Sequence, residues 1–200
     1  RRVLFRSRVG GTGLSLTDVT GTLGFQSLDI ATRGGTALAV ANAKTGDFTL
    51  TTRDGRIDAE GGTALDLDPL AIDLNFTAVR SNGAAGAGIV LDQVRGTGTG
   101  GNALTIGTVE IANSGAQGLL LTGGSQGQVT IARGTIADAG SAAVQIGQAG
   151  LANSGGTIGL DLGATITGNR GTPLVAIAEA GGTIRFAGAI SGNGGIAITG

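Results

Sequence analysis

The chain has 200 residues, of which 41 are glycine and 40% are hydrophobic, and its formal net charge is −1. It contains no Cys and no His, which excludes a disulfide framework, a thiolate metal site, a cysteine nucleophile and a serine–histidine–aspartate triad. So much glycine disfavours helix, while the hydrophobic content is too high for a disordered linker. The composition therefore indicates a folded domain built without helices.

The opening residues 1–7 do not match the pattern of the rest and resemble the translation of a sequencing-adapter oligonucleotide. We predict a non-native leader over 1–7 and a single domain segment of a longer protein over 8–200. Without Arg1, Arg2 and Arg6, ten basic residues face fourteen acidic ones, a net charge of −4. Nucleic acid is not an expected partner, because its binding needs a basic surface. No apolar run approaches the ~18 residues that span a membrane.

A short apolar triplet recurs along the chain just after glycine-rich turns. The triplets are Leu14-Ser15-Leu16, Leu38-Ala39-Val40, Leu65-Asp66-Leu67, Ile89-Val90-Leu91, Leu119-Leu120-Leu121, Val144-Gln145-Ile146, Leu174-Val175-Ala176 and Ile196-Ala197-Ile198. Their first residues are 22 to 30 positions apart, with a mean of 26. A repeat of this length is typical of a solenoid, in which each unit buries its apolar face by stacking on the next.

Each period holds two further apolar groups, represented by Ile72-x-Leu74 and Val79. Apolar residues two positions apart share one face of a strand, and the stretch from 70 to 82 alternates in this way through Ile72, Leu74, Phe76 and Ala78. Three strands per period predict an all-β fold, a right-handed parallel β-helix (β-solenoid) of about eight three-sided coils. We expect the first residues of the triplets to point inward and stack. These residues are Leu38, Leu65, Ile89, Leu119, Val144, Leu174 and Ile196.

Two other β-solenoids agree less well with the pattern. A left-handed hexapeptide helix needs intervals that are multiples of six, and the calcium-binding roll needs an Asp ligand where Gly10–Leu16 carries Ser15.

The corner after the third strand carries a recurrent Asn or Asp next to Gly. We expect these residues to form a structural turn ladder, because Asn, Asp and Gly tolerate positive φ at a sharp bend. The members are Asn82, Asn113, Asp138, Asn169 and Asn193. With segments such as Thr165-Ile166-Thr167-Gly168-Asn169, the repeat resembles the right-handed parallel β-helix of the pectin-lyase-like superfamily over roughly residues 10–200.

The Gly-, Ala- and Thr-rich, Cys-free style is similar to very large bacterial secreted or autotransporter-type surface proteins. That resemblance implies export to the cell surface as an outer-membrane-anchored passenger. It implies a structural and interaction role as a length of adhesin-like stalk that continues into further coils. A host or cell-surface glycan or protein is the expected kind of partner.

Acidic residues gather in the first half of the chain, and Asp66 and Asp68 are the candidate metal ligands, with Asp68 placed at a turn before Pro69. The pectin-lyase-like resemblance implies calcium, which that family binds with stacked Asp residues. The alternative interpretation is that these side chains alternate with core residues and face water. No catalytic or cofactor-binding residue is predicted.

The second functional hypothesis is a fragment of a β-helical polysaccharide lyase or glycoside hydrolase acting on an acidic polysaccharide. A hydrolase needs two carboxylates that converge on one bond, and after Asp92 the acidic residues are scattered over different coils. The glycine-rich run 96–101 and the loop 147–159 are the expected surface excursions, because loops carry binding on such scaffolds.

Overall fold

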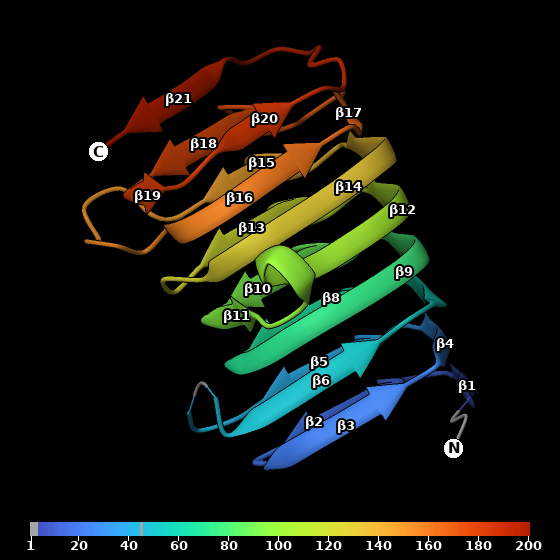
Figure 1. The fold of residues 1–200 in the computed structure, drawn as a ribbon. Coiled ribbons are helices and arrows are strands. Elements are labelled where there is room, and N and C mark those ends of the chain that lie inside the picture. The colour runs from blue at the N-terminus through green and yellow to red at the C-terminus, as the bar shows by residue number, and fades with distance from the viewer. Residues whose placement is uncertain (1–3, 45) are drawn as a thin grey trace.

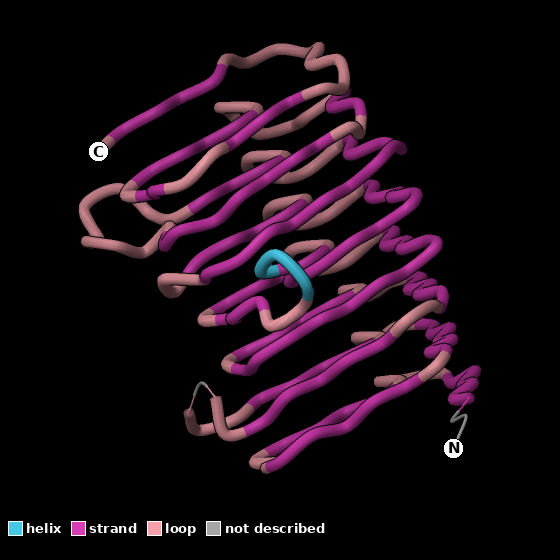
Figure 2. Tube along the Cα trace, in the orientation of Figure 1, coloured by secondary structure: helices cyan, strands magenta, loops and turns pink. Residues whose placement is uncertain are grey.

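The chain winds into a right-handed parallel β-solenoid in the computed structural model, which describes residues 4–44 and 46–200 (Figure 1). Every strand pair is parallel, and the coils stack along one axis with the two termini at opposite ends. Among the described residues, helix is confined to one short 3-10 turn, η1 (Thr99–Gly101), which is the single cyan segment of Figure 2. The predicted all-β class is confirmed.

One side of the solenoid is an eight-stranded sheet. Its strands are β2 (Leu14–Thr17), β5 (Leu38–Ala41), β8 (Leu65–Asp68), β10 (Ile89–Asp92), β13 (Leu119–Thr122), β15 (Val144–Ile146), β18 (Val175–Ala178) and β21 (Ile196–Thr199). Each strand contains residues of one predicted triplet, so the triplets mark the successive coils.

The other two sides share a thirteen-stranded sheet. Its strands are β1 (Leu4–Val9), β3 (Gly21–Phe25), β4 (Ser27–Arg33), β6 (Phe48–Thr52), β7 (Gly55–Glu60), β9 (Leu70–Asn82), β11 (Val94–Gly96), β12 (Asn102–Ala112), β14 (Gln126–Ala137), β16 (Gly156–Leu162), β17 (Thr165–Thr167), β19 (Ala180–Gly181) and β20 (Ile184–Phe186). The two sides are joined because β9, β12 and β14 continue through the corner between them. We call the side formed by β3, β6, β16 and the first halves of the long strands the second side. The third side consists of β4, β7, β17 and the second halves.

The long strands change their inward face at the corner. In β9, Phe76 is buried, Thr77 and Ala78 are not, and the next buried side chain is Val79. The predicted alternation through Ala78 is therefore wrong at its last member, because the bend reverses which parity faces the core. Successive side chains point to opposite faces only while the strand stays straight.

About six coils are complete, rather than the predicted eight. Each of these has strands on all three sides, whereas the coil that begins with β18 closes its third side through one bridge, Ile166 to Ile190, and β21 starts another coil. The difference arises because eight triplets delimit fewer than eight full turns.

The inward ladder of the eight-stranded sheet is confirmed from Leu38 to Val144. Its members are fully buried and lie in register. The register at Leu174 is wrong by one residue, since Val175 pairs with Val144. The Leu174 carbonyl accepts hydrogen bonds from the amides of both Ala143 and Val144, so Leu174 lies just before β18 and Val175 takes the place opposite Val144. Ile196 keeps the register but is 52% exposed, because β21 pairs on one side only.

Residues 4–9 form β1, which pairs in register with β4. Part of the predicted leader thus lies in the sheet, while its residues 1–3 lie outside the described residues. The origin assigned to residues 1–7 stays a prediction.

Candidate functional site

Three aspartates lie on the outer face of the eight-stranded sheet. Asp66 and Asp68, the predicted ligand candidates, are on β8, where they alternate with the buried Leu65 and Leu67. Asp92 on β10 follows Leu91, the register partner of Leu67, and so stacks beside Asp68. Sequence reasoning missed Asp92, although an Asp directly follows the last Leu of both triplets and the repeat itself carried that signal.

These carboxyl groups share an unfavourable electrostatic environment. Burial is the main cause that raises the pKa of Asp66, Asp68 and Asp92 above the ordinary 3.8, and the Asp92 charge further raises the pKa of the other two. One oxygen each of Asp68 and Asp92 is buried without a hydrogen-bond partner. Among the described residues no group of three or more His, Cys, Asp or Glu side chains is placed to hold a metal ion. Calcium at Asp66 and Asp68 therefore stays a prediction.

The five predicted turn residues occupy three different positions of the corner. A residue with positive φ follows the third side in successive coils, and Asn113 and Asp138 take that position with φ of 56° and 53°. Asn82 comes one residue before it, whereas Asn169 and Asn193 come one residue after it. The other members with positive φ are Gly34, Gly61, Gly83, Gly168 and Gly192. Glycine carries the turn at these positions because it pays no steric penalty there.

Three of these side chains, those of Asn82, Asn113 and Asn169, make contacts between coils. The Asn113 amide donates to the Asn82 side-chain oxygen at 3.0 Å. The Asn169 amide, 9% exposed, donates to the carbonyls of Ser141, one coil away, and of Gly171 at 2.7 Å. Asn193 is exposed, and no side-chain hydrogen bond is recorded for it within the described residues.

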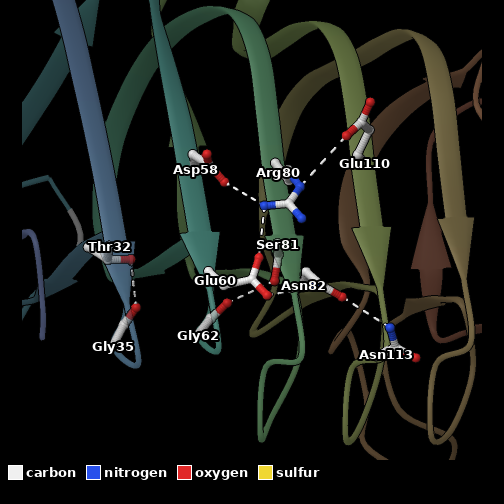
Figure 3. A network of polar contacts seen from close by, with 10 residues as sticks. All are labelled: Thr32, Gly35, Asp58, Glu60, Gly62, Arg80, Ser81, Asn82, Glu110 and Asn113. Carbon is white, nitrogen blue, oxygen red and sulfur yellow. Dashed lines mark hydrogen bonds and ion pairs between the residues drawn. The ribbon is translucent and has the colours of Figure 1, made fainter. Parts of the chain in front are cut away.

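A polar network that the sequence analysis did not identify crosses the outer face of the third side (Figure 3). The Arg80 guanidinium on β9 lies 3.0 Å from the Asp58 carboxylate and 2.9 Å from that of Glu60, both on β7, and 3.8 Å from Glu110 on β12. Asn82 donates to Glu60 at 2.9 Å and links this group to Asn113. The partners are about one coil apart in sequence, so only an alignment of the repeats could have brought them together.

Strand register explains why these charges meet. Asp58, Arg80 and Glu110 occupy equivalent outward positions on three adjacent strands. Neighbouring strands lie about 4.8 Å apart, so opposite charges at one position reach each other directly. Arg80 carries one positive charge against three carboxylates, and the same guanidinium holds both Asp58 and Glu60.

The two predicted surface excursions differ in how they are held. The turn around η1 is attached through Asn102, whose amide donates to the Asp73 carboxylate at 2.7 Å. The loop after β15 is closed by Ser154, which is 4% exposed and whose hydroxyl bonds both the amide and the carbonyl of Gln148. The second excursion is shorter than the predicted 147–159, because β16 begins at Gly156.

No family model, no curated protein and no solved structure matches the chain. Within the part of the chain that the structure describes, no helix is long and apolar enough to cross a membrane.

Proposed function

We propose that this chain is a structural and interaction segment of a β-helical stalk in a large exported bacterial surface protein, of the adhesin or autotransporter-passenger kind, without catalysis in this segment. The observation that carries the proposal is the use of outward charges. The Arg80 network and the Arg185–Asp161 pair, 2.8 Å apart, connect one coil to the next, so the outward charges hold neighbouring coils together.

The core supports the same role. Aliphatic residues stack in register along the eight-stranded sheet from Leu38 to Val144, so on that side each coil offers the next a closely similar apolar surface. In a solenoid, stability comes from such nearest-neighbour contacts, and length is added coil by coil. A rod of this kind suits a spacer that holds binding loops away from a cell.

The alternative function is a lyase or hydrolase fragment acting on an acidic polysaccharide. Only the Asp66, Asp68 and Asp92 group favours it, since stacked aspartates are what a calcium-dependent lyase of the pectin-lyase-like type would need. No ion pair joins these three groups to a basic side chain among the described residues.

The test has two parts. The folded 200-residue chain is incubated with polygalacturonate, with and without calcium, and unsaturated uronates and new reducing ends are measured. We expect neither product. In cells that carry the full-length protein, protease and antibody accessibility should place this segment outside. Product formation that is lost in Asp68→Asn would overturn the stalk proposal in favour of the lyase, and an intracellular segment would overturn the export part.

A further inference from the structure

The loop after β15 borders an open hollow on the outer face of the eight-stranded sheet. The hollow has a volume of about 700 Å³, within the range of ~300–1,000 Å³ typical of small-molecule sites. Its floor includes Leu120 and Gln145 on β13 and β15, and its wall includes Gln148, Leu151 and Asn153 of the loop. The loop projects from the side of the solenoid between β15 and β16 (Figure 1).

The lining is rich in carboxamides and lacks basic groups. Gln93, Gln117, Gln145, Gln148 and Asn153 all contribute to it, with Asp92 as the one charged residue. A carboxamide offers both donors and acceptors, which matches hydroxyl groups that also do both. The Asp92 carboxylate and the absence of Lys and Arg among the lining residues disfavour an anionic ligand, because its charge would be unpaired.

Apolar contact is available beside these amides. Leu151 is 54% exposed, one of four large apolar side chains that stand out on the described surface, and it faces the same hollow as Leu120. A small apolar area with a few convergent polar groups is the usual composition of a ligand site. The C–H faces of a sugar ring would cover the leucines while its hydroxyls reach the amides.

The loop that forms the wall is held in shape before any ligand binds. Besides the Ser154 contacts, the Leu151 amide donates to Gln148 at 3.1 Å, and the Gly124 amide of the preceding coil donates to Ser154 at 3.0 Å. On the floor, Gln117 donates to Gln145 at 2.7 Å, and Gln145 to the Gly147 carbonyl at 3.0 Å. By contrast, within the described residues no hydrogen bond engages the side-chain amides of Gln148 and Asn153. A preformed wall with uncommitted amides lowers the ordering cost of binding.

A peptide that adds itself as a strand is not accommodated. Strands β10, β13 and β15 each pair with a strand on both sides, so their backbone groups are already used and β-augmentation has no open edge here. Recognition in the hollow must come from side chains.

We infer that this hollow is a binding subsite for an uncharged saccharide, recognised by the amides of Gln145, Gln148 and Asn153 and by the apolar surface of Leu120 and Leu151. The inference rests on the proposed interaction role and gives it a ligand class. It also separates this site from the acidic polysaccharide of the lyase alternative.

The experiment follows the side-chain amide signals of the 15N-labelled 200-residue chain during titration with maltotriose, cellotriose, mannotriose and trigalacturonate. A neutral trisaccharide should shift the Gln145, Gln148 and Asn153 signals, and trigalacturonate should not. The variant Gln148→Ala/Leu151→Ser should weaken that binding roughly tenfold or more, since it removes one hydrogen bond and one apolar contact. Gln26→Ala, at an exposed glutamine outside the hollow, is the matched control and should bind like the parent.

Three outcomes would overturn the inference: no shift with any neutral trisaccharide, equal shifts with trigalacturonate, or unchanged affinity in the double variant. Shifts of the same signals by the uncharged peptide Gly-Ser-Gly-Ser-Gly, in the absence of shifts by the sugars, would assign the hollow to a peptide instead. Circular dichroism of each variant shows that the chain is folded. Failure of this binding test leaves the stalk role intact, because that role is judged by surface exposure and the absence of polysaccharide cleavage.

Discussion

The third side of the solenoid is built differently before and after β12. In β4, β7 and β9 the buried aliphatic residue comes first, as in Ile57, and a small side chain follows two positions later, as in Ala59. In β14 and β17 the order is reversed, with Gly134 at the first position and Ile136 or Ile166 at the second. The strand β12 joins the two regions by burying both Val109 and Ile111.

The outward residues change at the same place. The row that holds Asp58, Arg80 and Glu110 continues as Thr135 and Thr165. The backbone register is thus constant while charge pairing gives way to uncharged threonines. The comparison shows that a coil can be stabilised by different side-chain combinations, provided that each presents apolar residues inward at one of two positions.

The largest effect should come from the ladder that both regions share. Leu119 is fully buried between Ile89 and Val144, so Leu119→Asp would place an unpaired charge in the core and lower the free energy of unfolding by several kcal/mol, about 4 or more. Denaturant unfolding followed by circular dichroism measures it, with Leu120→Asp on the outer face as control. A variant at Leu119 that unfolds like the parent would show that the inward register is misassigned.

A smaller loss should follow from filling the position where the two regions differ. Gly134 has φ of 125°, and a Cβ there would overlap the Val109 carbonyl. We expect Gly134→Ala to cost about 2–4 kcal/mol in unfolding free energy. The matched substitution Gly86→Ala meets no atom within 4 Å and should be nearly neutral. Equal stability of the two variants would contradict the close backbone approach.

The Arg80 network should make a small contribution to stability that decreases with salt. Arg80→Met removes an ion-pair network whose members are 39% to 65% exposed, and such pairs contribute about 1 kcal/mol or less. The loss should be measurable at low ionic strength and should shrink at about 1 M salt, where the Debye length is ~3 Å. Arg133→Met, on the same side and outside the recorded ion pairs, is the control. A loss that persists at high salt would indicate a packing role for the Arg80 stem instead.

The smallest expected effect is a gain. Burial raises the pKa of Asp92 above 3.8, so the folded chain binds this proton more tightly than the unfolded chain does. The tighter proton binding stabilises the folded chain relative to the unfolded chain only while Asp92 is protonated. The folded chain therefore loses stability as the pH rises from 3.8 to the raised pKa of Asp92, and above that pKa the full cost of the partly buried charge applies. Asp92→Asn should raise the free energy of unfolding at pH 7 by under about 1 kcal/mol, since the group is partly solvated, and the melting temperature should rise with it. The gain should vanish near pH 3.8, and Asp47→Asn serves as the exposed control. A gain that is independent of pH would rule out this origin.

Repeat spacing alone determined much of the fold. A mean interval of 26 residues and pairs of apolar residues two apart predicted a parallel β-helix, because stacking coils is the way for such short strands to bury their apolar face. The aliphatic ladder from Leu38 to Val144 followed from the same pattern, since a strand has a fixed two-residue period.

Only the tertiary structure decided where strands bend and which outward residues meet. The reversal after Phe76 and the one-residue shift at Leu174 depend on backbone geometry at corners, where an apolar residue can stay buried on either parity. The contacts of Arg80 with Asp58 and Glu110, and the stacking of Asp68 with Asp92, depend on register between coils that differ in length. Loops of variable length hide that register in the sequence, and the hydrogen bonds between adjacent strands fix it in the fold.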